Sequence, residues 1–280
     1  MLADVIDLLC CPHCGGGLEL GEGTARCADG HSFDVARQGY LNLLPGDART
    51  GSADTAAMVR ARVEFLAGGH YAPVAEAVAD AATTTEAGEG LAIDLGAGTG
   101  YYLAELLERL PAASGLALDV SKHALRVAAR AHPRIGAVGC DAWAGLPVRD
   151  AVAALAINVF APRDPAELAR VLVPGGSLVV VTPNRAHLAE LVSAVGMLTV
   201  QERKRERLAG KLGTLFEPVA ETAVERELVL GHGDLTALVA MGPSARHLDE
   251  RQVDERVAAL PDPLPVTLSV TVATYRRAAG

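Results

Sequence analysis

The stretch Leu91–Gly100 reads LAIDLGAGTG, and it decides the fold of the chain. Apart from Asp94, its first five residues are apolar, which is typical of a short strand buried on both faces. Three glycines then stand at alternate positions, and the following segment, YYLAELLERL, has apolar residues at helical spacing. Strand, glycine turn and helix in this order bring unpaired backbone N–H groups to a turn that a ligand can approach closely.

The spacing of the glycines and the acid before them indicate which ligand the turn binds. The pattern is G-x-G-x-G, whereas the dinucleotide fingerprint is G-x-G-x-x-G. Asp94 would repel a phosphate, so a nucleoside with a cationic or carboxylate-bearing tail fits better. The stretch resembles motif I of the class I S-adenosylmethionine (SAM) methyltransferases, D/E-x-G-x-G-x-G. The alternative is a glycine turn without a ligand. The resemblance implies a set of SAM-binding residues in and beside the turn: Asp94, Gly96, Gly98, Gly100 and Tyr101.

Two further acids follow the next two predicted strands. Asp119 ends the buried segment GLALDVS, where an acid in this fold reaches the ribose hydroxyls; the alternative is an acidic cap for the next helix. Asp141 follows the third strand, where these enzymes often contact the adenine amino group. Trp143, two residues on, could flank the adenine or fill the core.

The fourth predicted strand ends in the sequence NVFAP, where the target of the reaction should meet the cofactor. Ligands of open α/β sheets gather at the carboxyl ends of the strands. Phe160 is placed to stack on a base, and Asn158 to bond its edge. Asp164 is a candidate for accepting a proton. These three residues are the catalytic candidates.

A metal site is predicted near the N-terminus. Cys11, Cys14, Cys27 and His31 follow the spacing C-x2-C-x12-C-x3-H, which supplies the four N or S ligands that zinc prefers. The residues between the pairs, LELGEGTARC, read as a hairpin, so the module is a zinc ribbon or knuckle. Four filled positions leave none for water, and the zinc is therefore structural. A cluster of reduced cysteines is the alternative, and Cys10 and His13 leave some doubt about the register.

The segment after the ribbon makes the resemblance specific. The zinc spacing followed by H-x-FD-x-A-x-x-GY-x-NLL resembles the N-terminus of the 23S rRNA (guanine-N1)-methyltransferases, a family that includes the tylosin-resistance type. The motifs AGGHYAP, TP-x-x-x-HL and MGPSARH extend the resemblance over nearly the whole chain. It implies that Tyr71 and His187 contact SAM, and that a homodimer methylates N1 of a guanine in a domain II hairpin of 23S rRNA. Macrolide resistance is one role this activity could serve.

The predicted fold is a class I SAM methyltransferase, a Rossmann-like α/β domain with a seven-stranded mixed sheet, and a small zinc ribbon before it. We place the zinc-binding RNA-recognition module at residues 1–50 and the methyltransferase domain at residues 51–280. Two late segments, VERELVL and LPVTLSVTVATYRR, are predicted to form an edge hairpin that completes the strand order 3-2-1-4-5-7-6.

Composition and charge limit the other possibilities. A net charge of −9 argues against nucleic-acid binding over the whole surface, although a local basic cleft stays possible. Basic residues gather at 201–211, and Arg60 and Arg62 lie close together; each group is either a solvated helix face or a contact to RNA phosphates. No secretory signal or membrane span is expected, and the cysteine usage favours a reducing, cytoplasmic location.

Two other functions stay open at this point. One is a SAM-dependent small-molecule methyltransferase whose zinc ribbon is only a structural cap, which would turn over a metabolite without RNA. The other is a non-catalytic, zinc-dependent RNA binder with a relic cofactor pocket, which would bind RNA but not SAM.

Overall fold

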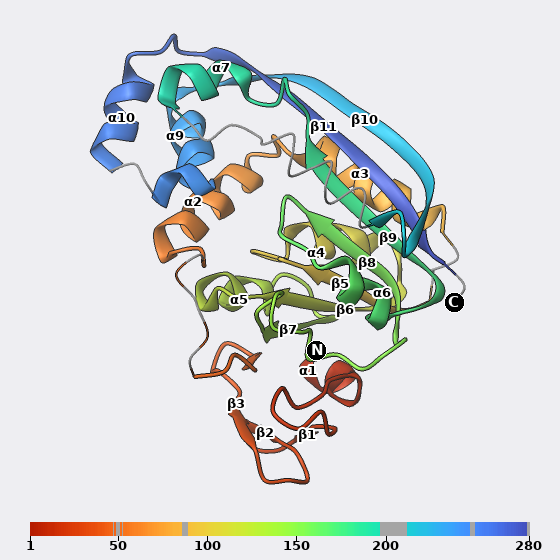
Figure 1. Cartoon of the computed structure of the whole chain (residues 1–280). Coiled ribbons are helices and arrows are strands. Elements are labelled where there is room, and N and C mark those ends of the chain that lie inside the picture. Colours follow the sequence, from red (N-terminus) through yellow and green to blue (C-terminus); the bar gives the residue numbers. More distant parts are fainter. Residues whose placement is uncertain are drawn as a thin grey trace.

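The computed structural model describes residues 1–46, 48, 51, 53–85, 89–196, 212–246 and 250–278. Its centre is an eight-stranded sheet in the order β10-β11-β9-β8-β5-β6-β7-β4 (Figure 1). The strands of this sheet are β4 (Tyr40–Asn42), β5 (Glu89–Leu95), β6 (Ala112–Asp119), β7 (Ile135–Gly139), β8 (Ala153–Val159), β9 (Leu172–Pro183), β10 (Phe216–Leu230) and β11 (Leu264–Arg277).

Seven of these strands confirm the predicted class I order, with β5 as its first strand and β11 between β9 and β10. The predicted number of strands was wrong, because β4 adds an eighth. It pairs in parallel with β7, Tyr40 opposite Ala137 and Asn42 opposite Gly139. Tyr40 and Leu41 are buried, and their pairing covers an edge of β7 that would otherwise be open.

Helices cover both faces of the sheet, as the alternation of side chains along β5 requires. Leu91, Ile93 and Leu95 contribute to one core cluster and Ala92 to the other. The helices on the Ala92 face are α3 (Ala72–Thr83), α4 (Tyr101–Arg109) and α5 (Lys122–Ala128). The opposite face holds α1 (Leu2–Val5), α6 (Pro165–Val171) and the apolar residues of the ribbon.

A helical cap lies at the end of the molecule opposite the ribbon (Figure 1). It contains α2 (Ala56–Ala67), α9 (His232–Ala240) and α10 (Glu250–Ala258), and the short α7 (Ala189–Leu191) lies nearby. Thr55 is the N-cap of α2 and accepts a hydrogen bond from the Met58 amide at 3.2 Å. Helix α10 was not predicted from the sequence.

The ribbon consists of β1 (Glu19–Leu20), β2 (Thr24–Arg26) and β3 (Ser32–Asp34), so the predicted hairpin is confirmed and gains a third strand. Backbone bonds tie the ribbon to the loop after β7: the Cys10 amide donates to Pro147 O at 3.1 Å and the Arg149 amide to Leu8 O at 2.9 Å. Because β4 also belongs to the main sheet, the first 46 residues contribute to both parts. The division at residue 50 stays a prediction.

In the part of the chain that the structure describes, no helix is long and apolar enough to cross a membrane. The basic segment 201–211 lies outside the described residues.

Candidate cofactor site and metal centre

The glycine turn after β5 is as tight as the sequence predicts. Gly96 and Gly98 have φ angles of 77° and 55°, in the left-handed region that favours glycine. A Cβ on Gly96 would lie 2.3 Å from the Cβ of Ala161, which follows β8. One on Gly98 would lie 2.8 Å from Nη1 of Arg62. The turn is therefore packed between α2 and the end of β8, with no room for a side chain.

Asp94 lies beneath this turn and is almost completely buried. Neither carboxylate oxygen has a hydrogen-bond partner among the described residues. Burial, together with the nearby charge of Asp119, raises the pKa of Asp94 to about 8. An unpartnered buried acid requires a proton or a cationic partner. Two unpartnered carboxylate oxygens can accept hydrogen bonds from the ammonium group at the amino-acid end of SAM, so Asp94 fits this end of the cofactor.

Asp119 ends β6 beside the same turn. Its carboxylate accepts hydrogen bonds from the Gly98 amide at 2.8 Å and the Ser121 amide at 2.7 Å. The alternative of an acidic helix cap is wrong, because Ser121 is the N-cap of α5. A carboxylate held this way keeps lone pairs for two hydroxyls, so the ribose role stays a prediction.

Aromatic side chains gather at the carboxyl end of β8. Phe160 stacks on His187 with ring centroids 5.8 Å apart, and Tyr71 lies 6.1 Å from Phe160. Nδ1 of His187 accepts from the Ser269 amide at 3.3 Å, so the proton of the neutral ring is on Nε2, which faces the Tyr71 hydroxyl at 3.4 Å. Burial lowers the pKa of His187 to about 4, so the ring is uncharged at neutral pH.

Two of the three catalytic candidates have structural roles. The fully buried Asn158 amide donates to Leu95 O at 2.8 Å and Pro162 O at 3.2 Å, and it accepts from Arg163 at 2.8 Å. The role of bonding a base edge is therefore wrong for Asn158, which instead fixes the loop after β8 to the end of β5. Asp164 is the N-cap of α6 and accepts from the Ala166 amide at 2.9 Å.

Phe160, the third candidate, is placed differently. It is 40% exposed, and its φ of 54° is rare for a residue with a side chain. Such strain persists only where the surroundings impose it, as they often do at functional sites.

Two tyrosines stand at the start of α4, and both are half-buried. Their rings lie 5.1 Å apart in an edge-to-face arrangement, and burial raises the pKa of both hydroxyls. The contact of Tyr101 with SAM stays a prediction.

Asp141 and Trp143 follow β7. The Asp141 carboxylate accepts from the Trp143 amide at 3.0 Å and closes the turn. Trp143 is 63% exposed, so the suggestion that it fills the core is wrong. Contacts of either residue with adenine stay predictions.

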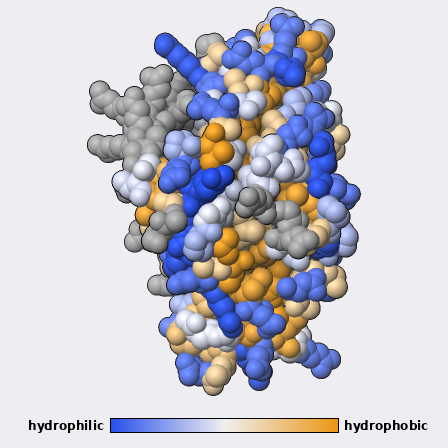
Figure 2. All heavy atoms as spheres, turned by 90° about the vertical axis from the view of Figure 1, so that its right-hand side faces the viewer, coloured by the Kyte–Doolittle hydropathy of each residue, from blue (hydrophilic) through white to orange (hydrophobic). Residues whose placement is uncertain are grey.

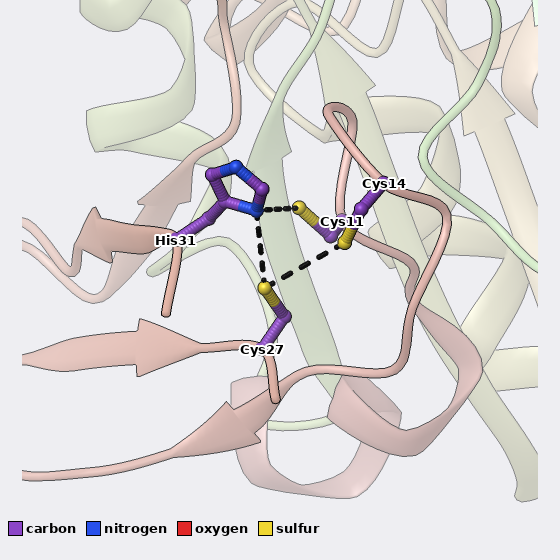
Figure 3. A group of neighbouring side chains, drawn as sticks. All are labelled: Cys11, Cys14, Cys27 and His31. Atoms are coloured by element: carbon purple, nitrogen blue, oxygen red, sulfur yellow. Dashed lines mark hydrogen bonds between the residues drawn. The ribbon is translucent and has the colours of Figure 1, made fainter. Parts of the chain in front are cut away.

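The four predicted metal ligands converge between the Cys11–Cys14 loop and the Cys27–His31 turn of the ribbon (Figure 3). Nδ1 of His31 lies 3.6 Å from the sulfur of Cys11 and 3.3 Å from that of Cys27, and the sulfurs of Cys14 and Cys27 are 3.7 Å apart. A zinc tetrahedron with bonds of about 2.0–2.3 Å has edges of roughly 3.5–3.8 Å. The set fits structural zinc, and Cys10 and His13 are outside it.

The strand order, the glycine turn and the unpartnered acid define a class I SAM-dependent methyltransferase that carries a zinc ribbon. Two family models agree with this class: the RlmA N-terminal zinc ribbon matches residues 9–51, and a methyltransferase domain matches residues 92–176. The chain is 49% identical to the 23S rRNA (guanine(748)-N(1))-methyltransferase of Streptomyces fradiae, over 99% of both chains. It is 48% identical, again over 99% of both, to a Micromonospora griseorubida protein assigned to 23S rRNA (guanine-N1) methylation. The chain belongs to the family of 23S rRNA (guanine-N1)-methyltransferases.

Solved structures support the fold alone. A methyltransferase from Bacillus halodurans aligns with a TM-score of 0.51 at 14% identity, covering 72% of this chain and 98% of its own. The [4+2]-cyclase SpnF aligns with a TM-score of 0.52 at 18% identity, covering 74% and 81%.

Proposed function

We propose that this chain transfers the methyl group of SAM to N1 of a guanine in a hairpin of 23S rRNA. The observation that carries the proposal is the 49% identity to the Streptomyces fradiae enzyme, which spans 99% of both chains and so includes the ribbon and the methyltransferase domain. A small-molecule enzyme would need the cofactor pocket but not the RlmA-type ribbon that this chain carries before it. The base corresponding to guanine 748 of that relative is the proposed target.

The residues of the pocket suggest how SAM is held. Bound SAM supplies a methyl group on a sulfonium, already a good leaving group. Asp94 binds the ammonium, Asp119 the ribose and Asp141 the adenine amino group. Tyr71 and His187, both uncharged at neutral pH, line the pocket without repelling the sulfonium. Positioning of the reacting atoms is worth roughly 7–11 kcal/mol in favourable cases.

The guanine must leave its stack before N1 becomes accessible, because N1 carries a proton and lies within a Watson–Crick pair. Phe160 is the exposed aromatic at the cofactor end of β8, and stacking of a base on such a ring contributes roughly 1–3 kcal/mol. We assign Phe160 to stacking of the target guanine. Asp164, as a helix cap, is a poor candidate for the proton acceptor.

We also propose two contacts with partners, one with the RNA and one with a second copy of the chain. The ribbon contacts the RNA hairpin, and two copies of the chain pair along the outer edge of β10. That edge has no partner strand in the described residues, and Val219 and Val229 are 52% and 61% exposed on it. Figure 2 shows the side of the molecule that carries β10, where apolar and hydrophilic residues both reach the surface. Pairing of two such edges would satisfy the open backbone groups.

The test is methylation of purified, unmodified 23S rRNA with labelled SAM, followed by digestion to nucleosides. We expect 1-methylguanosine with the intact chain and a loss of at least tenfold in kcat for Phe160→Ala, with little change in SAM affinity. Val63→Ala, an apolar side chain on α2 that is 42% exposed, is the control. Label in another nucleoside would refute the proposed position, and label in no RNA would favour the small-molecule enzyme.

A further inference from the structure

Arg62 on α2 lies against the glycine turn that follows β5. Its Nη1 is 2.8 Å and its Cδ 3.8 Å from the position that a Cβ of Gly98 would take, so the guanidinium covers the backbone of this turn. Its side chain is only 27% exposed. This exposure is low for a solvated helix face, and a contact of Arg62 with RNA phosphates stays a prediction.

Two anchors hold the guanidinium in this position, and both use Nη2. This nitrogen donates to the backbone oxygen of Met241 at 2.9 Å and lies 2.7 Å from a carboxylate oxygen of Asp54. Asp54 is itself fixed, because its backbone oxygen accepts from the Ser121 hydroxyl at 2.7 Å. Its carboxylate also lies 3.2 Å from Arg246. Arg62 is therefore oriented by α9 and by the turn after β6.

Nη1, the nitrogen that faces Gly98, makes no hydrogen bond to any described residue. A guanidinium has five N–H donors in a rigid fork, and fixing one nitrogen aims the others. Asp94 lies at the end of β5, directly before the turn that Arg62 covers, so the unpartnered carboxylate and the unpartnered donor flank the same turn.

The amino-acid end of SAM is a zwitterion, and the two groups complement it. Asp94 takes the ammonium, and the carboxylate needs a cation on the other side. We propose that Arg62 binds the α-carboxylate of SAM through Nη1 and thereby selects the cofactor by its amino-acid end. The proposal rests on the cofactor site and is independent of the RNA substrate.

The test is calorimetric titration with S-adenosylhomocysteine and with its decarboxylated analogue, in the absence of RNA. We expect the unmodified protein to bind S-adenosylhomocysteine roughly 10- to 100-fold more tightly, as a charge-assisted hydrogen bond would give. Arg62→Gln should lose this preference and keep the affinity for the analogue. Arg62→Lys, which keeps the charge but not the fork, should show an intermediate preference. Arg60→Gln, on the exposed side of the same helix, should keep it all.

Three results would overturn the proposal. Equal affinity of the unmodified protein for both ligands would do so whether or not any variant folds. If Arg62→Gln bound both ligands more weakly by the same factor, the role of Arg62 would be structural only. An unchanged preference in Arg62→Gln would show that another group binds the carboxylate. RNA methylation does not enter this test, so its failure leaves the proposed function standing.

Discussion

Asp94 is the residue on which the account of the cofactor site depends most, because its carboxylate is buried without a partner. Its pKa is raised from 3.8 to about 8, so the free protein carries the protonated acid at pH 7. An ammonium ligand requires the carboxylate, and binding must then release a proton. We expect the affinity for S-adenosylhomocysteine to rise with pH, by up to tenfold per unit, and to level off above pH 8.

The raised pKa of Asp94 also determines how the free energy of unfolding changes with pH. Between pH 4 and 8 the folded, ligand-free protein holds a proton on Asp94 that the unfolded chain has lost, so this group reduces the free energy of unfolding as pH rises. Asp94→Asn should remove the pH slope of ligand binding and weaken the ligand at pH 8. Calorimetry across pH 6–9 measures both effects. A slope that persists in Asp94→Asn would contradict the assignment.

Gly96 gives a second prediction at the residue scale. A Cβ there would lie 2.3 Å from the Cβ of Ala161, which cannot rotate away, and the φ of 77° disfavours any side chain. Gly96→Ala should lower S-adenosylhomocysteine affinity at least tenfold, because the turn must shift, with overpacking costing roughly 1–3 kcal/mol. Gly233→Ala, in open space on α9, is the matched control and should keep the affinity, with Tm unchanged or slightly raised because alanine favours a helix more than glycine does. Equal behaviour of the two variants would refute the packing argument.

Among the structural elements, the zinc ribbon is the one whose stability we expect to depend on bound metal. Its three strands are two or three residues long, and the four ligands join its two turns. Cys14→Ser should abolish bound zinc and lower Tm by several degrees, and RNA methylation should fall. S-adenosylhomocysteine affinity should stay within about threefold, because the ligands belong to a sheet separate from the one that forms the cofactor site.

Zinc content, thermal unfolding and calorimetry on the same preparation provide the check. His13→Ala is the control: its ring stacks on Phe33 beside the cluster but is no ligand, so the variant should keep its zinc. A full complement of zinc in Cys14→Ser would refute the ligand set. A parallel loss of cofactor affinity would show that the ribbon also holds the pocket.

The elements differ in how well the sequence predicts them. Strand β5 and the glycine turn were predictable because buried strands and glycine turns have local signatures, and so was the ligand spacing of the ribbon. Strand β4 was not, since three residues carry no period and only their pairing with β7 defines them. Asn158 stands at the correct end of β8, but its hydrogen bonds to Leu95 and Arg163 are tertiary and leave no mark in the sequence. The same holds for Arg62, 36 residues before Gly98.

In the whole molecule, β10 is one edge of the main sheet, and no strand among the described residues pairs with its outer side. If two copies pair along β10, as we propose, a charge on that edge should separate them. Val219→Lys with Val229→Lys should convert a dimer to a monomer in light scattering after gel filtration, with Tm within a few degrees. The control is Glu217→Gln on the same strand. A monomer for the unmodified protein, or an unchanged dimer for the variant, would place the contact elsewhere or exclude it.

We propose that methylation of N1 of a guanine in 23S rRNA requires the ribbon and the methyltransferase domain together. Primer extension across the large-subunit rRNA after incubation with the protein and SAM is the decisive measurement, because an N1 methyl group removes a Watson–Crick donor and halts reverse transcriptase. We expect one new SAM-dependent stop, one nucleotide before the guanine that corresponds to position 748 of the Streptomyces fradiae enzyme's target. The absence of any new stop, with S-adenosylhomocysteine binding intact, would contradict the proposed function and leave a SAM-dependent methyltransferase with a different substrate.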